Sequence, residues 1–134
     1  MIFSILLCAL SGIIFTGWDV YGFGDKVQGG KWNLIPYRVT QTALQFGIYA
    51  ALFFTHHYGA LAGFAVTHWC MGYDYLYYVW RGEKYEGYLV TWFKIALPQL
   101  ISNEVRGHYI SGMELKWIGK VAIVLGLIIS AAFA

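Results

Sequence analysis

The stretch VTQTALQFGIYAALFFTHHYGALAGFAVTHWCMGY, from Val39 to Tyr73, decides the fold of this chain of 134 residues. It runs for thirty-five residues without a Lys, Arg, Asp or Glu. A helix rises about 1.5 Å per residue and the hydrocarbon core of a bilayer is about 30 Å thick, so one straight helix of this length is roughly 20 Å too long. The chain is therefore expected to turn at His56-His57-Tyr58-Gly59. This turn predicts two transmembrane helices, at about 39–55 and 60–80.

The overall composition is typical of a chain whose solvent is largely lipid. Hydrophobic residues make up 59% of the sequence and charged residues 12%, against about 25% charged residues in soluble domains. The net charge is only +2, and no cluster of Lys and Arg indicates nucleic acid as a partner. The length fits one domain, so the sequence predicts a single polytopic membrane domain over residues 1–134.

Two further apolar segments predict the first and last spans, at about 2–18 and 115–134. The first lacks the positively charged start and the cleavage site of a signal peptide, so a retained helix is expected. Residues 88–106 have apolar side chains at i, i+3 and i+4, with Lys94 and Arg106 on the other side. This spacing predicts an amphipathic helix that lies in the plane of the membrane interface.

The placement of the charges distinguishes four spans from five. If residues 88–101 crossed the membrane, Lys94 would lie inside the bilayer and the other cations would be divided between the two sides. If they lie flat, all nine Lys and Arg fall on one side, together with all seven Asp and Glu. The positive-inside rule favours this second arrangement. We therefore expect four spans, both termini on the non-cytoplasmic side, and the interfacial helix on the cytoplasmic side; five spans are the alternative.

Small residues predict which helices approach one another closely. Gly59, Ala60 and Gly63 begin the 60–80 segment, and Gly47 and Ala51 lie in the segment before it. Small side chains allow helix backbones to approach closely in lipid. The sequence therefore predicts close packing within the hairpin that these two segments form.

Polar residues inside the spans are the first candidates for function, because polar groups in hydrocarbon are costly. Gln41, Gln45 and Tyr49 share one sector of the 39–55 helix, and His68 and Tyr75, seven residues apart, share a face of the 60–80 helix. If the two faces meet, they form a site for haem, a quinone or a pigment. The simpler interpretation is interhelical hydrogen bonding. His68 has no histidine partner at the same depth, which weighs against haem held by two imidazoles.

The hairpin tip offers a candidate metal site at His56 and His57. Adjacent residues on a helix point about 100° apart, so the pair alone is a weak site for a divalent ion.

A second group of titratable residues lies on the predicted cytoplasmic side, at Asp19, Asp74, Glu104 and His108. Glu104 and His108 are four residues apart, and on a helix a carboxylate at that spacing can orient an imidazole as a general base. Such a site would suit an enzyme that acts on a lipid headgroup. The sequence contains no HExxH, GxSxG or glycine-rich phosphate loop, so a solvated charged face is the simpler interpretation.

The sequence thus predicts a structural or accessory subunit that packs against other membrane subunits or a second copy of itself. One alternative is a membrane-embedded protein that binds haem, another ligand or a metal ion. A second alternative is an interfacial enzyme, and a channel formed by self-association is a further possibility.

Overall fold

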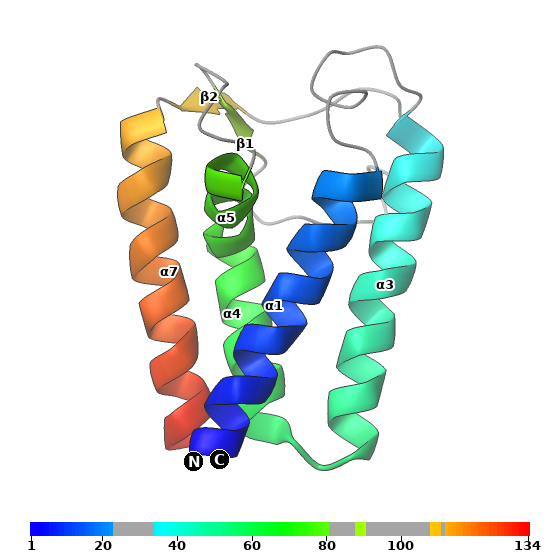
Figure 1. Cartoon of the computed structure of the whole chain (residues 1–134), viewed down its shortest axis with the longest axis vertical. Coiled ribbons are helices and arrows are strands. Elements are labelled where there is room, and N and C mark those ends of the chain that lie inside the picture. The colour runs from blue at the N-terminus through cyan, green and yellow to red at the C-terminus, as the bar shows by residue number, and fades with distance from the viewer. Residues whose placement is uncertain (23–33, 81–87, 91–107, 111) are drawn as a thin grey trace.

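The computed structural model of the chain describes residues 1–22, 34–80, 88–90, 108–110 and 112–134. It is a helical bundle, as the sequence predicts (Figure 1). The helices are α1 (Ile2–Gly22), α3 (Leu34–Phe54), α4 (Tyr58–Trp69), α5 (Gly72–Trp80) and α7 (Gly112–Ala132). Two short strands, β1 (Tyr88–Val90) and β2 (His108–Ile110), pair antiparallel at one end. The two termini lie close together at the opposite end of the bundle.

The predicted hairpin turn is confirmed. α3 ends at Phe54 and α4 begins at Tyr58, so the second helix starts two residues earlier than predicted. His56 adopts a left-handed conformation with φ of 61°, and the His57 N–H donates a hydrogen bond to the Leu52 carbonyl oxygen at 2.9 Å. The turn therefore reverses the chain within three residues.

The prediction of one continuous helix over 60–80 is wrong, because the chain breaks between α4 and α5. Met71 has a φ of 69°, a left-handed conformation that interrupts a right-handed helix. Gly72 follows, and a Cβ atom there would collide with the side chain of Thr67. The chain can therefore fold tightly over the last turn of α4 only because residue 72 is a glycine.

The predicted interfacial helix over 88–106 is wrong at its start. Residues 88–90 form β1, in which Tyr88 pairs with Ile110 and Val90 with His108. Aromatic and β-branched residues favour strands, and a partner strand of similar composition lies twenty residues further along. The remainder of the predicted helix, from 91 to 106, lies outside the described residues.

The small-residue face of α4 packs against α7, so the predicted close contact with α3 is wrong. A Cβ atom on Gly63 would collide with the Gly126 carbonyl oxygen, whereas a Cβ atom on Gly47 would meet nothing within 4 Å. A Cβ atom on Gly59 would lie 2.8 Å from the Phe133 carbonyl oxygen. Gly126 and Ser130 are four residues apart, like Gly59 and Gly63. The matching spacing on α7 lets the two backbones meet.

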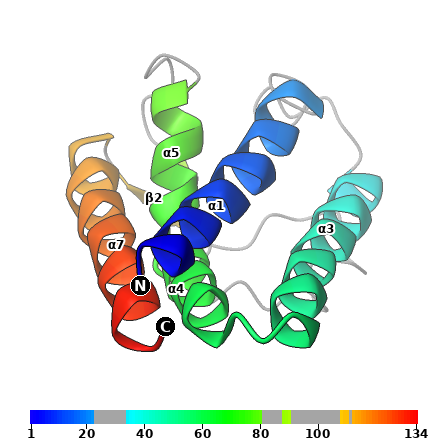
Figure 2. The same ribbon diagram turned by 60° about the horizontal axis from the view of Figure 1, so that its bottom comes forward.

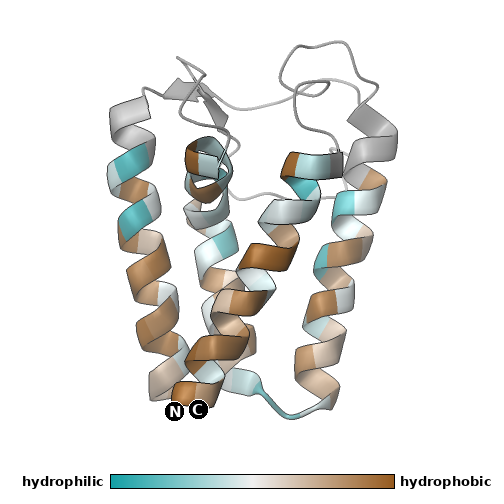
Figure 3. Ribbon diagram, in the orientation of Figure 1, coloured by the Kyte–Doolittle hydropathy of each residue, from teal (hydrophilic) through white to brown (hydrophobic). Residues whose placement is uncertain are grey.

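The described surface is unusually apolar, and several polar side chains are buried beside the hydrophobic core. Among the described residues, the outer faces of α1, α3 and α7 expose large apolar side chains, and the hydropathy colouring shows apolar residues along most of α1 (Figure 3). The buried polar residues are Ser4, Ser11, Thr16, Gln41, Gln45, Thr67, His68 and Ser130. Soluble monomers rarely expose extended apolar surfaces.

By length and composition, one helix in the described ranges can cross a membrane, the α1 segment Ile2–Tyr21. Val39–Phe54 is a shorter apolar helix.

Candidate functional site

His68 lies in the centre of the bundle, enclosed by aromatic rings. It is 2% exposed, and its ring centroid lies 5.0 Å from that of Phe15, at right angles to it. The Phe64 ring stacks on it at 6.4 Å and the Tyr73 ring lies at 6.3 Å. Because these rings fill the space around the imidazole, a haem ligated by His68 would require them to move.

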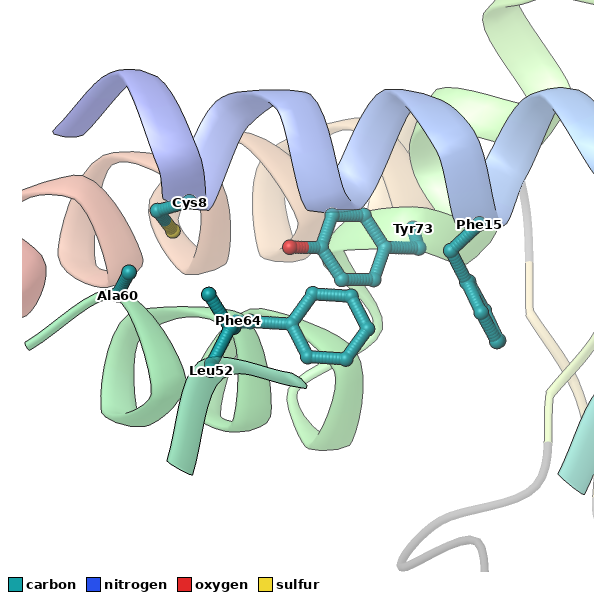
Figure 4. Packing of buried hydrophobic residues seen from close by; sticks show 6 residues of the cluster. All are labelled: Cys8, Phe15, Leu52, Ala60, Phe64 and Tyr73. Atoms are coloured by element: carbon teal, nitrogen blue, oxygen red, sulfur yellow. The ribbon is translucent and has the colours of Figure 1, made fainter. Parts of the chain in front are cut away.

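Two pairs of polar side chains connect neighbouring helices through hydrogen bonds. The Thr67 hydroxyl donates to the Gly63 carbonyl oxygen at 2.7 Å, and Thr67 also hydrogen-bonds with Tyr73. Figure 4 shows the Tyr73 ring between α1 and the Phe64 ring, with its hydroxyl directed toward the side where Cys8 lies.

The second pair joins α1 to α7. The Ser130 hydroxyl donates to the Leu127 carbonyl oxygen at 2.7 Å, and Cys8 hydrogen-bonds with Ser130. Both cysteines are free, with Cys8 buried and Cys70 exposed. These contacts satisfy buried polar groups within the bundle, which is the role expected of packing residues.

α3 directs its predicted polar face inward. Gln41 and Gln45 are buried, and the Gln45 Nε2 atom donates to the Tyr49 hydroxyl at 3.1 Å. The Tyr49 ring meets the Phe64 ring edge to face at 5.5 Å. The inward position of these residues therefore agrees with the helical periodicity, while cofactor binding by them stays a prediction.

Tyr75 does not share a face with His68. A Cβ atom on Gly119 would collide with the Tyr75 side chain, so Tyr75 packs on α7. The break at Met71 rotates α5 relative to α4, and Tyr73 takes the place beside His68. Tyr73 and Phe15 do not follow from the sequence pattern, because a continuous helix over 60–80 would direct Tyr73 elsewhere and no signal in the sequence pairs α1 with α4.

His56 and His57 have different neighbours at the hairpin tip, and metal binding by them stays a prediction. The His56 Nδ1 atom lies 2.8 Å from the Tyr58 hydroxyl, at hydrogen-bond distance. The His57 ring instead meets the Phe3 ring of α1 at 5.3 Å. In the part of the chain that the structure describes, no three His, Cys, Asp or Glu residues are arranged to hold a metal ion.

The predicted catalytic residues lie on three different elements and on a segment outside the described ranges, and catalysis by them stays a prediction. Asp19 lies in the last turns of α1 and Asp74 in the first turn of α5, both half-buried. An acidic residue at a helix N-terminus is stabilised by the helix dipole, which is a structural role for Asp74. His108 belongs to β2, so the helical spacing assumed between Glu104 and His108 is wrong. Glu104 itself lies outside the described residues.

An apolar groove between α3 and α4 was not predicted. Its volume is about 500 Å³, and it opens to the outside of the bundle. α3 stands apart from α5 and α7 (Figure 2), and the groove is lined by residues of α3 and α4. Tyr49 belongs both to the groove and to the buried polar face of α3. The lining residues are Phe46, Tyr49, Ala50, Phe53, Leu61, Ala65 and Trp69.

A scan against protein-family profiles, a search of curated proteins and a search of solved structures each gave no match. The function is therefore inferred from the surface and the interior of the molecule.

Proposed function

We propose that this chain is an integral membrane protein of four spans that acts as a structural or accessory subunit. In this proposal its groove between α3 and α4 receives an apolar helix of a partner subunit. The observation that carries the proposal is the open apolar groove on the side of a bundle whose described outer faces expose many large apolar side chains.

Helix lengths support four spans. α1 and α7 each have 21 residues, about 31 Å at about 1.5 Å per residue. α4 and α5 together run from 58 to 80 and form one interrupted span, which is tolerated where neighbouring helices satisfy the freed backbone groups. The termini lie at the end of the bundle that carries the hairpin, which agrees with an even number of spans and with both termini on the non-cytoplasmic side.

The groove favours a helix as its occupant because helices associate in lipid through close packing. Large aromatic side chains form its rims, with Phe46 and Phe53 on α3 and Trp69 on α4. Ala50 and Ala65 provide small positions between them. Side chains of a partner helix can insert into this groove by knobs-into-holes packing. They would make more contacts there than on a convex surface.

A photocrosslinking amino acid tests this proposal. It is placed at Ala65 in the groove and, as a matched control, at Leu10 on the exposed face of α1. We expect irradiation of intact membranes to give a discrete protein adduct from position 65 and none from position 10. Adducts from neither position, or the same adducts from both, would overturn the proposal.

A second candidate function is the binding of a flat apolar ligand, such as a quinone or a pigment, in the same groove. The groove volume of about 500 Å³ lies within the range of about 300–1,000 Å³ for small-molecule sites. The Tyr49 hydroxyl, held by Gln45, provides a polar group near this apolar lining. An absorption spectrum of the protein purified in mild detergent, with mass spectrometry of an organic extract, separates this candidate from the first. A stoichiometric chromophore or quinone favours the ligand, and its absence favours the partner helix.

A further inference from the structure

The start of α7 presents a pair of cations on the outer surface of the bundle. Lys116 and Lys120 are both exposed and are four residues apart, so they are neighbours on one side of the helix. Trp117, beside them, is 68% exposed. Figure 3 shows α7 hydrophilic in this part and hydrophobic over the turns that follow.

The apolar surface continues directly from this cationic pair. Val121, Val124 and Ile128 are all more than half exposed. From Lys120 to Ile128 the helix rises about 12 Å, against about 15 Å for the hydrocarbon of one leaflet. The outer face of α7 therefore combines a cationic end with an apolar track about one leaflet deep.

This combination complements one class of molecule. Within the described ranges, Lys116 and Lys120 make no ion pair with an acidic side chain, and ammonium groups near hydrocarbon require a counter-charge. A phospholipid with a net negative headgroup offers a phosphate to both lysines and an acyl chain to the valine and isoleucine side chains. A zwitterionic lipid offers the same chain, but its phosphate is already balanced by its own cation. The exposed indole of Trp117 suits the headgroup level, between the phosphate and the acyl chain of the bound lipid.

We infer that the outer face of α7 is a binding site for one anionic phospholipid, with Lys116 and Lys120 holding the headgroup phosphate. This inference rests on the proposed membrane function, since it needs α7 to face lipid. It adds a site on the side of α7, separate from the groove between α3 and α4.

Native mass spectrometry of the purified full chain, titrated with phosphatidylglycerol or phosphatidylcholine in detergent, tests the inference. The variant K116Q/K120Q removes both charges. The variant K116R/K120R keeps them, and K26Q/K31Q removes two charges from the segment 23–33. The attraction between a lysine and an anionic headgroup falls off within a Debye length, so the two lysines that contact the phosphate dominate, and we expect K116Q/K120Q to bind the first phosphatidylglycerol about tenfold more weakly or worse. Both control variants should keep the wild-type affinity, and all variants should bind phosphatidylcholine equally.

Equal phosphatidylglycerol binding by wild type and K116Q/K120Q would overturn the inference, and so would equal affinity of the wild type for the two lipids. Loss of a co-purifying protein from K116Q/K120Q, with lipid binding unchanged, would also overturn it and would assign the lysines to a protein partner. Circular dichroism and gel filtration show whether each variant folds.

Alkaline carbonate extraction of membranes distinguishes failure of the proposed membrane function from failure of this inference. A chain that is released contradicts the membrane function, whereas a retained chain without lipid preference contradicts this inference alone.

Discussion

Gly63 sets the distance between α4 and α7, because its missing side chain leaves room for the Gly126 carbonyl oxygen. A methyl group at residue 63 must push two backbones apart, and overpacking of this kind costs about 1–3 kcal/mol. We therefore expect Gly63→Ala to lower the unfolding midpoint in detergent, as measured by thermal denaturation.

Gly47→Ala is the matched control for this substitution. A Cβ atom there meets nothing within 4 Å, and alanine is better than glycine in a helix by up to about 1 kcal/mol. Gly47→Ala should leave the midpoint unchanged or raise it. Equal losses for the two variants would contradict the assignment of the close helix contact to α4 and α7.

His68 contributes to stability through packing. Removal of its ring leaves a cavity among Phe15, Phe64 and Tyr73, and large-to-small core substitutions cost about 2–5 kcal/mol. We expect His68→Ala to lower the unfolding midpoint and His68→Phe to lower it less, because phenylalanine fills more of the space. Both variants should keep the crosslink from position 65. Loss of that crosslink in a folded His68→Phe protein would indicate that the imidazole itself serves the function.

At the scale of the elements, α3 and α4 form the surface that we propose as the partner contact. Ala65→Trp fills the groove between them, and the groove opens outward, so the bulky side chain has room. We expect this variant to lose its partner in mild-detergent extracts of membranes, while its unfolding midpoint stays near that of the wild type.

Leu10→Trp, which adds the same residue to the exposed face of α1, should keep the partner. Retention of the partner by Ala65→Trp would place the partner contact elsewhere on the bundle.

The elements differ in how far they follow from the sequence. The turn at His56 was predictable because an uncharged stretch longer than a bilayer must fold back. The break at Met71 was not, since neither Cys70 nor Met71 is a helix-breaking residue and only Gly72 marks the position. The strand at 88–90 was missed because three apolar residues fit the periodicity of a helix as well as that of a strand. Its pairing with 108–110 is a long-range contact, which a local sequence pattern does not indicate.

The candidate site, like the fold, could be predicted from the sequence only in part. The inward faces of α3 and α4 follow from helical periodicity, which places Gln45 and His68 in the interior. Tyr73 was missed because it depends on the rotation of α5 at the break. The groove was missed because it depends on the separation of α3 from α4, and the small residues that predict a close approach of these two helices pack α4 against α7 instead.

At the scale of the whole molecule, an apolar exterior surrounds a core of aromatic and aliphatic side chains in which several polar side chains are also buried. The start of α7 and the two strands lie at one end of the bundle, and the hairpin and both termini lie at the other. In lipid this arrangement places the exposed hydrophobic surface where it is favourable. The proposed partner helix and anionic lipid then bind on two different sides of the same bundle.

Cysteine accessibility in sealed, oriented membrane vesicles tests the four-span account most directly. Thr55→Cys in the hairpin turn and Ala134→Cys at the C-terminus are made in a Cys70→Ser background and treated with a membrane-impermeant maleimide. The four-span account predicts that both positions are labelled from the same side of the membrane, and that Lys116→Cys is labelled only from the other. Labelling of Thr55→Cys and Ala134→Cys from opposite sides would contradict it and favour five spans.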